Sequence, residues 1–294
     1  MAGLDGNMLK LIKALAENRI QDAKNAAICC CVNDGTKKNE GTISYYKKLL
    51  ENGSVNMFEL PANLKNLLNV QDVSDFNEER YFLGDQQKSL FEEISRGVSI
   101  TTKLLEYRIP YRNSTIVYGV PGTGKTEFAK YTAYKLGLPY AYVNFSYLIE
   151  SYMGKTSQNL QKIFDYCKGQ KCVLMLDEVD CIGISRGNDS GCDGELGRTT
   201  IALMQALDGL IDGQIIIAAT NRVDRLDKAL LRRFQRTCEF NPYDKQERLS
   251  MIKTYMDSVN EAFLTDDVIT YSEELHTQSE IVTFLIEKIA EKVS

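Results

Sequence analysis

Apolar positions in the middle of the chain follow two kinds of pattern. Short runs of mostly apolar residues, which are typical of buried strands, occur at residues 114–118, 138–145, 172–176 and 215–219. Apolar side chains at helical spacing occur between these runs, at residues 127–136, 159–166 and 195–207. Strands and helices therefore alternate, which predicts an α/β fold with a parallel sheet covered by helices on both faces.

The N-terminal part of the chain has a purely helical pattern. Apolar residues from Leu9 to Leu15 fall on one helical face, and small residues from Ala23 to Cys30 fall on another. A polar break follows at residues 33–41. We expect residues 1–57 to form a helical hairpin that serves as an adaptor, an oligomer contact or a partner contact. Residues 58–85 are expected to form a linker with short turns.

The C-terminal part of the chain also lacks strand-length apolar runs. Helical spacing recurs at residues 249–256 and 281–293, so residues 244–294 are predicted to form a small helical lid. The large α/β subdomain then spans residues 86–243 and begins with an amphipathic helix at residues 86–105.

A phosphate-binding loop pattern, G-x-x-x-x-G-K-T, follows the first predicted strand. The residues expected to bind a nucleotide are Gly119, Val120, Pro121, Gly122, Thr123, Gly124, Lys125, Thr126 and, at the start of the next helix, Glu127. Glycines let backbone N–H groups point at phosphate oxygens, and the helix adds the positive end of its dipole. Lys125 would reach the β- and γ-phosphates, and the Thr126 hydroxyl would bind Mg²⁺. A glycine-rich turn that matches by chance is the alternative.

Polar residues follow the two later apolar strands. Asp177 and Glu178 end one strand, and Asn221 lies just beyond the other. Ligands of open α/β sheets bind at the carboxyl ends of the strands, so we expect these residues near the phosphate-binding loop. Asp177 would hold Mg²⁺, Glu178 would act as general base for the attacking water, and Asn221 would orient that water or touch the γ-phosphate. Capping or solvated polar side chains are the alternative.

Composition narrows the class of protein. The 294 residues are 44% hydrophobic and 26% charged with a net charge of −5, which predicts a globular core and disfavours nucleic acid held by bulk electrostatics. Eight cysteines without a C-x-x-C pair and a single histidine disfavour a structural zinc site. Because no signal peptide or membrane-spanning run is evident, we expect a soluble cytoplasmic protein with free thiols and no membrane partner.

Taken together, the motifs resemble those of the AAA ATPases, a branch of the AAA+ group of phosphate-loop NTPases. The resemblance covers roughly residues 80–294 and rests on GVPGTGKT, VLMLDEVD and IIIAATNRVDRLDKALLRRF. It implies an ATP- and Mg²⁺-dependent hydrolase that works as a ring, expected to be a hexamer. It also implies that Arg232 and Arg233 act as arginine fingers on the ATP of a neighbouring subunit, since a guanidinium suits the charge of a transferring phosphoryl group. An ordinary surface arginine pair is the alternative.

The resemblance also suggests roles outside the nucleotide site. Tyr152 and Met153 resemble the first pore loop, which would grip an extended polypeptide in the ring channel, although Tyr152 could instead be a core residue at a helix end. Residues 81–84 would line the adenine pocket. His276 could approach the nucleotide, with surface or packing roles as alternatives.

The sequence therefore predicts an ATPase ring that remodels, unfolds or threads a protein substrate. Its short single-ring plan looks most like katanin- and spastin-type remodellers or small prokaryotic AAA ATPases. A separate protease or effector could bind through residues 1–57. The alternatives are a nucleic-acid remodeller, such as a transposition helper, and an assembly scaffold that uses ATP as a switch.

Overall fold

A computed structural model describes residues 4–16, 20–33, 43, 47, 50, 60–61, 63–107, 109, 111–151, 155–168, 171–182, 193–210 and 214–293. The chain divides into two compact units, Met1–Pro61 and Ala62–Ser294. Within the described residues, no helix is both long and apolar enough to span a membrane.

The first unit contains two helices, α1 (Gly6–Ala16) and α2 (Ile20–Asn33). They pack against each other, and Ala14 of α1 and Ala23 of α2 are buried. Small side chains at these positions let two helical backbones approach closely. The described part of this unit therefore contains two packed helices, while the hairpin over residues 1–57 and its role as a contact remain predictions.

The second unit is built on a six-stranded sheet with the order β1-β3-β4-β5-β2-β6. Its strands are β1 (Asn69–Gln71), β2 (Asn113–Tyr118), β3 (Tyr140–Asn144), β4 (Val173–Asp177), β5 (Ile215–Thr220) and β6 (Arg236–Glu239). Only β1 runs antiparallel to its neighbour in this sheet, and the remaining pairs are parallel. The carboxyl ends of β2, β4 and β5 therefore meet at one edge, where a ligand site is expected.

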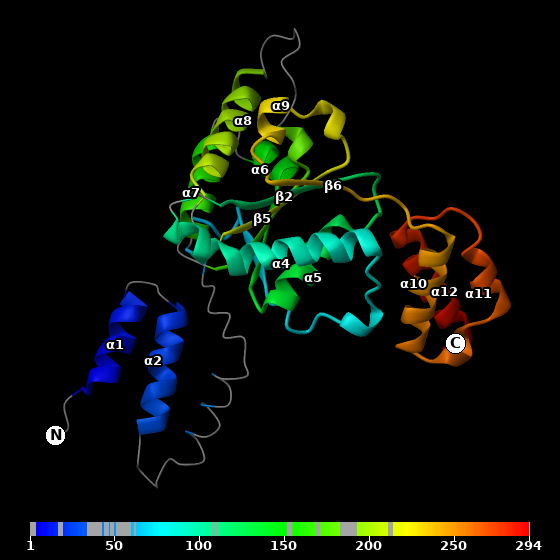
Figure 1. Cartoon of the computed structure of the whole chain (residues 1–294), viewed down its shortest axis with the longest axis horizontal. Coiled ribbons are helices and arrows are strands. Elements are labelled where there is room, and N and C mark those ends of the chain that lie inside the picture. Colours follow the sequence, from blue (N-terminus) through cyan, green and yellow to red (C-terminus); the bar gives the residue numbers. More distant parts are fainter. Residues whose placement is uncertain are drawn as a thin grey trace. The chain divides into compact units, whose positions relative to one another are not determined.

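Helices cover both faces of the sheet. Figure 1 shows α4 (Asp85–Glu106) and α5 (Lys125–Leu136) on one side of the strands, and α7 (Thr156–Lys168) and α8 (Asp193–Asp208) on the other. The strands β4 and β5 are apolar at nearly every position because both faces of the sheet are covered, and β5 is buried along its whole length. The α/β class and the alternation of elements predicted from the sequence are confirmed.

Residues 58–85, expected to form only short turns, also carry the edge strand β1 and a short 3₁₀ helix, η2 (Glu78–Arg80). Leu64 and Leu68 are buried just before β1. The strand is three residues long and contains a single apolar residue, Val70, so it leaves no periodic signal in the sequence. The pairing with β3 supplies its backbone hydrogen bonds and stabilises it there.

The C-terminal residues form a helical lid with a core of its own. Its helices are α10 (Lys245–Asp257), η5 (Glu261–Phe263), α11 (Asp266–Tyr271) and α12 (Gln278–Val293). Ile252, Val268 and Ile281, from α10, α11 and α12, pack together in that core. Asp244 and Glu247 form a reciprocal capping box at the start of α10, which fixes the point where the chain enters the lid.

Candidate functional site: a phosphate-binding loop and a paired carboxylate

The loop between β2 and α5 is shaped by glycines. Gly119, Gly122 and Gly124 have φ values of 145°, 84° and 81°, which residues with a side chain rarely adopt. Gly119 is also required by packing, because a Cβ there would lie 2.0 Å from the Phe240 carbonyl oxygen. The loop can therefore curl around an anion in front of α5, whose first-turn N–H groups have no intrahelical acceptors.

Lys125 is held inside this loop. Its Nζ donates hydrogen bonds to the carbonyl oxygens of Gly119 and Val120, each at 2.9 Å. Burial lowers the pKa of Lys125, while the nearby carboxylates of Asp177 and Asp180 raise it. An ammonium group in so enclosed a position is a strong donor to a ligand anion, and replacing neutral carbonyl oxygens by phosphate oxygens would strengthen its hydrogen bonds.

The Asp177 carboxylate lies at the end of β4, beside the first turn of α5. Asp177 Oδ2 accepts hydrogen bonds from the Thr126 hydroxyl and the Tyr142 hydroxyl, both at 3.2 Å, and Oδ1 accepts one from Glu178 N–H at 3.0 Å. Burial raises the pKa of Asp177, and these hydrogen bonds lower it in part. A partly buried carboxylate next to a threonine hydroxyl offers the hard oxygen ligands that Mg²⁺ prefers.

Glu178 has a left-handed backbone. Its φ of 56° and ψ of 40° make it the one non-glycine residue with positive φ in the described part of the chain. It caps η3 (Val179–Cys181), and Cys181 N–H donates to its carbonyl oxygen at 3.0 Å. A non-glycine residue in this region costs of order 1–2 kcal/mol, and such costs are typical of functional sites.

A side-chain hydrogen bond ties the end of β5 to η3, the short helix that follows β4. The Thr220 hydroxyl donates to Asp180 Oδ1 at 2.6 Å and accepts from Arg222 N–H at 2.9 Å. These two bonds fix the backbone on both sides of Asn221, whose exposed side chain lines the cavity described next. The amide is therefore presented from a rigid turn at the carboxyl edge of the sheet.

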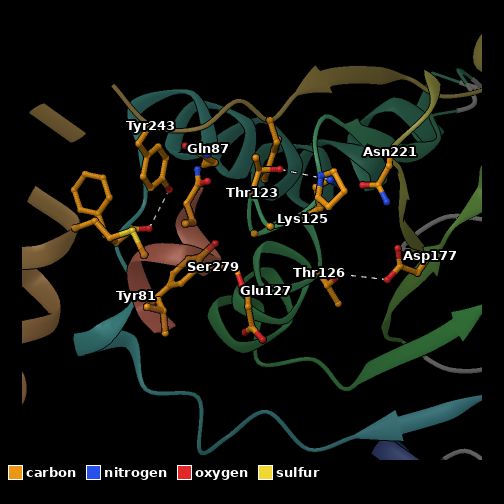
Figure 2. Close-up of a pocket in the computed structure, with 18 of the residues that line it drawn as sticks. Tyr81, Gln87, Thr123, Lys125, Thr126, Glu127, Asp177, Asn221, Tyr243 and Ser279 are labelled. Carbon is orange, nitrogen blue, oxygen red and sulfur yellow. Dashed lines mark hydrogen bonds between the residues drawn. The ribbon is translucent and has the colours of Figure 1, made fainter. Parts of the chain in front are cut away.

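A cavity of about 440 Å³ brings most of the predicted residues together. The predicted residues that line it are Pro121, Gly122, Thr123, Gly124, Lys125, Thr126, Glu127, Asp177, Glu178 and Asn221. Figure 2 shows Lys125 and Thr126 between Asp177 and Asn221 on one side and Tyr81 and Tyr243 on the other. Gly119 and Val120 contribute their carbonyl oxygens to Lys125 rather than lining the cavity.

The donor set of this cavity fits a nucleoside triphosphate with Mg²⁺. The loop and Lys125 provide positive charge and N–H donors for phosphates, and the partly buried Asp177 carboxylate would gain a cation. The volume lies within the range of small-molecule sites. Tyr81 and Phe82 of the segment expected to line an adenine pocket do line the cavity.

The two predicted fingers lie outside this cavity. Arg232 ends α9 (Lys228–Leu231) and is exposed, with no ion pair to a described residue. Arg233 Nε donates to Asp208 Oδ2 at 3.0 Å, and its Nη1 donates to the Ala229 carbonyl oxygen at 2.7 Å. Neither arginine is placed to act on a ligand in the cavity of its own chain.

Two other predictions have different outcomes. Tyr152 and Met153, the predicted pore residues, lie outside the described residues. His276 packs in the lid: its ring stacks on Tyr271 with centroids 3.9 Å apart, and its Nε2 lies 3.7 Å from Glu274 Oε2. It does not line the cavity, so the packing interpretation holds.

Sequence reasoning missed Tyr142, Asp180, Tyr243 and Gln278. Tyr142 and Asp180 bind predicted site residues or their neighbours, whereas Tyr243 and Gln278 line the cavity from the side of the lid. The sequence offered a weak signal for Asp180, which lies three residues after Asp177 in the same motif. No local pattern identifies the other three, because they meet the site through strand register and lid packing.

Comparison with known families accounts for this geometry. The family model described as "ATPase family associated with various cellular activities (AAA)" matches residues 115–242, the segment that contains the loop, Asp177, Asn221 and both arginines. The chain carries an AAA ATPase domain. Domains of this family use ATP with Mg²⁺, in agreement with the donor set found in the cavity.

The AAA domain also relates the chain to named proteins. It is 33% identical over 207 residues to a proteasome-activating nucleotidase of Methanoregula boonei, a match that covers 67% of this chain and 47% of that protein. It is 32% identical over 226 residues to a 26S proteasome regulatory subunit 8 homologue of Schizosaccharomyces pombe, covering 72% and 55%. It is 37% identical over 147 residues to the ATP-dependent zinc metalloprotease FtsH 1 of Salinibacter ruber, covering 48% and 21%.

These matches span about half the length of the first two relatives. They support the predicted AAA family, but they do not support the expected likeness to katanin and spastin. The motifs on which that expectation rested belong to the AAA domain in general, and the short single-ring plan was too coarse a criterion to separate subtypes.

Proposed function

We propose that this chain hydrolyses ATP with Mg²⁺ in the cavity between the phosphate-binding loop and the lid. The observation that carries the proposal is the meeting of Lys125, Thr126, Asp177 and Glu178 in one cavity. No one of these residues defines an ATPase by itself. Together they offer a phosphate cradle, a metal site and a general base.

Each residue has a distinct role in this proposal. Lys125 exchanges the Gly119 and Val120 carbonyl oxygens for phosphate oxygens. Thr126 and Asp177 hold Mg²⁺, which neutralises charge on the phosphates when it is bound. Glu178 accepts the proton of the attacking water, and the Asn221 amide orients that water. Tyr142 keeps Asp177 in place through its hydrogen bond to Oδ2.

We further propose that the active form is a ring, with a hexamer as the expected size. Arg232 and Arg233 do not line their own chain's cavity, and Arg232 is exposed. If Arg232 and Arg233 stabilise the charge of the transferring phosphoryl group, they therefore do so in the cavity of a neighbouring chain. The pairing of Arg233 with Asp208 would hold α9 and the fingers in a fixed orientation.

A protein is the proposed substrate of the ring, which would remodel, unfold or thread it with Tyr152 and Met153 in the channel. The similarity to a proteasome-activating nucleotidase and to proteasome regulatory subunits supports this choice. A separate protease or effector that binds residues 1–57, and a cytoplasmic location, belong to the same proposal. The net charge of −5 argues against the alternative of a nucleic-acid remodeller.

Stimulation of ATP turnover separates these classes. The purified chain is given Mg·ATP with a permanently unfolded protein, carboxymethylated α-lactalbumin, or with duplex DNA, and phosphate release is followed. The proposal predicts faster turnover with the unfolded protein and no response to DNA. Stimulation by DNA alone would favour the nucleic-acid remodeller, and a basal rate that neither polymer changes would favour the scaffold that uses ATP as a switch.

A further inference from the structure

The cavity has two chemically different ends. The end at the phosphate-binding loop is polar and charged, whereas Phe82, Tyr243, Met251 and Val282 line the rest of the cavity with aromatic and aliphatic surface. Figure 2 shows Tyr243 on the side of the loop that is opposite to Asp177. A flat, mostly apolar group attached to a phosphate chain would fit this division, since its faces would pack on apolar side chains.

The side chain of Gln278 brings a buried oxygen without a hydrogen-bond partner among the described residues to this cavity. Gln278, the first residue of α12, lines the cavity and is 7% exposed. Its Nε2 donates to the Asn241 carbonyl oxygen at 3.1 Å, whereas its Oε1 is buried and accepts no hydrogen bond within the described residues. The carbonyl partner can only accept, so it fixes which way the amide points. A buried acceptor left in this state costs about 1–3 kcal/mol, a cost that a ligand donor would remove.

Gln278 is also held at a fixed position relative to the phosphate-binding loop. The next residue, Ser279, donates its backbone N–H to the Gly122 carbonyl oxygen at 2.9 Å. A Cβ on Gly122 would lie 2.9 Å from the Thr277 hydroxyl oxygen, so the start of α12 packs directly on the loop. A ligand whose phosphates occupy the loop therefore meets the first turn of α12 at a defined place.

We propose that Gln278 Oε1 accepts a hydrogen bond from the exocyclic amino group of adenine and thereby selects adenine nucleotides. This inference rests on the proposed ATPase function and adds the residue that recognises the base. Adenine carries an amino donor at its six-position, whereas guanine and hypoxanthine carry a carbonyl oxygen there. That oxygen would face Oε1, so that two buried acceptors would lie opposite each other with no proton to share.

A second amide in the cavity is less well suited to this task. Gln87 is 4% exposed and its Oε1 is also without a partner. However, Gln87 Oε1 and Glu247 Oε1 both lie close to Gly84, at 2.5 Å and 2.6 Å from the position of a Cβ there. The Gln87 amide can turn over and donate to this carboxylate, whereas the bond to Asn241 prevents Gln278 from doing so.

The proposal is tested by removing the Gln278 amide and the amino group of the nucleotide, first separately and then together. Calorimetry measures the Mg²⁺-dependent binding of ADP and of purine riboside 5′-diphosphate, which lacks the amino group, to the full chain and to Gln278→Met. The full chain should bind ADP about tenfold more tightly than the amino-free analogue. In Gln278→Met this difference should disappear, with the affinity for the analogue nearly unchanged. Gln246→Met, at an exposed glutamine of the lid, should retain the tenfold difference.

The outcomes separate this inference from the proposed function. If Gln278→Met weakens both nucleotides equally, or if the full chain binds them equally, Gln278 does not recognise the amino group and the inference is wrong. Equal binding of the two nucleotides by the full chain would overturn the inference even if the variant does not fold. The full chain could also bind ADP more tightly than 2′-deoxy-ADP. If Gln278→Met loses that preference, Oε1 contacts the ribose hydroxyl rather than the base, and the inference is again wrong. If the full chain binds none of these nucleotides, the proposed function fails, and this inference fails with it.

Discussion

The Thr126 hydroxyl donates a hydrogen bond to Asp177 Oδ2 across a distance of 3.2 Å. This contact joins the first turn of α5 to the end of β4, two segments that lie 51 residues apart in the chain. The Tyr142 hydroxyl shares the same carboxylate oxygen. The pair therefore provides an oxygen site for a hard cation at the point where the phosphate-binding loop ends, which is the arrangement that Mg·ATP requires.

The first prediction concerns the charge on Asp177. Because burial raises its folded-state pKa, the folded chain binds more protons than the unfolded chain between the ordinary value and the raised value. The metal-free protein should therefore lose stability as the pH rises through this interval. Asp177→Asn removes the charge, so its free energy of unfolding relative to the parent should increase as the pH rises from the ordinary carboxyl pKa through the raised one.

Denaturant unfolding in EDTA at several pH values measures this difference, and comparison with the parent cancels the titration of other groups. The same variant should lose the stabilisation that Mg·ADP gives to the parent. A relative stability that stays constant with pH, or that decreases, would show that ionised Asp177 is not a stability cost in the metal-free chain.

The second prediction concerns Lys125. Lys125→Ala should weaken ATP binding by about a hundredfold or more, because it removes a charge-assisted donor at the point where phosphate repulsion is greatest. Lys135→Ala is the matched control: Lys135 lies on the same helix and pairs with Glu78 on the surface. Calorimetric titration of both variants provides the comparison. Equal ATP affinity of the Lys125 variant and the parent would refute the assignment of the phosphate-binding loop.

The third prediction concerns the backbone of Glu178. Glycine adopts a φ of 56° without the steric cost that a Cβ brings, so Glu178→Gly should be more stable than Glu178→Ala by about 1 kcal/mol. Because both variants lack the carboxylate, the difference between their free energies of unfolding isolates the cost of the left-handed backbone. In a domain of this size, the difference corresponds to roughly 2–4 °C in Tm. An alanine variant as stable as the glycine variant would mean that residue 178 is not strained.

Much of the fold and of the nucleotide site could be predicted because it depends on local pattern. The strands β4 and β5 are short apolar runs, β2 ends in the apolar run Ile116–Tyr118, and the loop before Lys125 has a fixed spacing of glycines. Parallel strands place their carboxyl ends together, so Asp177 and Asn221 could be assigned to the same edge without coordinates. The edge strand β1 was missed because Val70 is its only apolar residue.

The remaining features depend on contacts between distant segments. Tyr142 meets Asp177 because β3 and β4 pair in a register that places Asn144 opposite Asp177. Gln278 enters the cavity because Ser279 N–H bonds to Gly122, a contact between the lid and the loop that no sequence period encodes. The left-handed backbone of Glu178 likewise arises from the sharp turn into η3 rather than from the residue itself.

The fourth prediction concerns the carboxylate of Glu178. Glu178→Gln keeps the size and much of the hydrogen bonding of the side chain but removes the base. It should bind ATP with the affinity of the parent and release phosphate about 10²–10⁴-fold more slowly. Glu239→Gln, at an exposed position at the end of β6, serves as the control. Turnover near the parent rate would remove Glu178 from the mechanism.

The fifth prediction concerns the two arginines at the end of α9, which do not line the cavity. Arg232→Ala combined with Arg233→Ala should leave ATP binding intact and reduce turnover by about 10³-fold, because a finger supplied by a neighbour acts on the transferring phosphoryl group. Arg225→Ala, another exposed arginine near α9, is the control. Because Arg233 also pairs with Asp208, Arg232→Ala alone separates the effect on turnover from the loss of that ion pair.

The most direct measurement of the central claim, hydrolysis at sites shared between chains, is the ATPase rate of a mixture of two inactive variants. One chain carries Arg232→Ala and Arg233→Ala with Glu178 intact, and the other carries Glu178→Gln with its arginines intact. Sedimentation first establishes that the two chains assemble together. In a ring, the intact Glu178 of the first chain meets the intact arginines of the second, so the mixture should hydrolyse ATP although each variant alone does not. A co-assembled mixture as inactive as its components would contradict shared sites and leave Arg232 and Arg233 with a structural role.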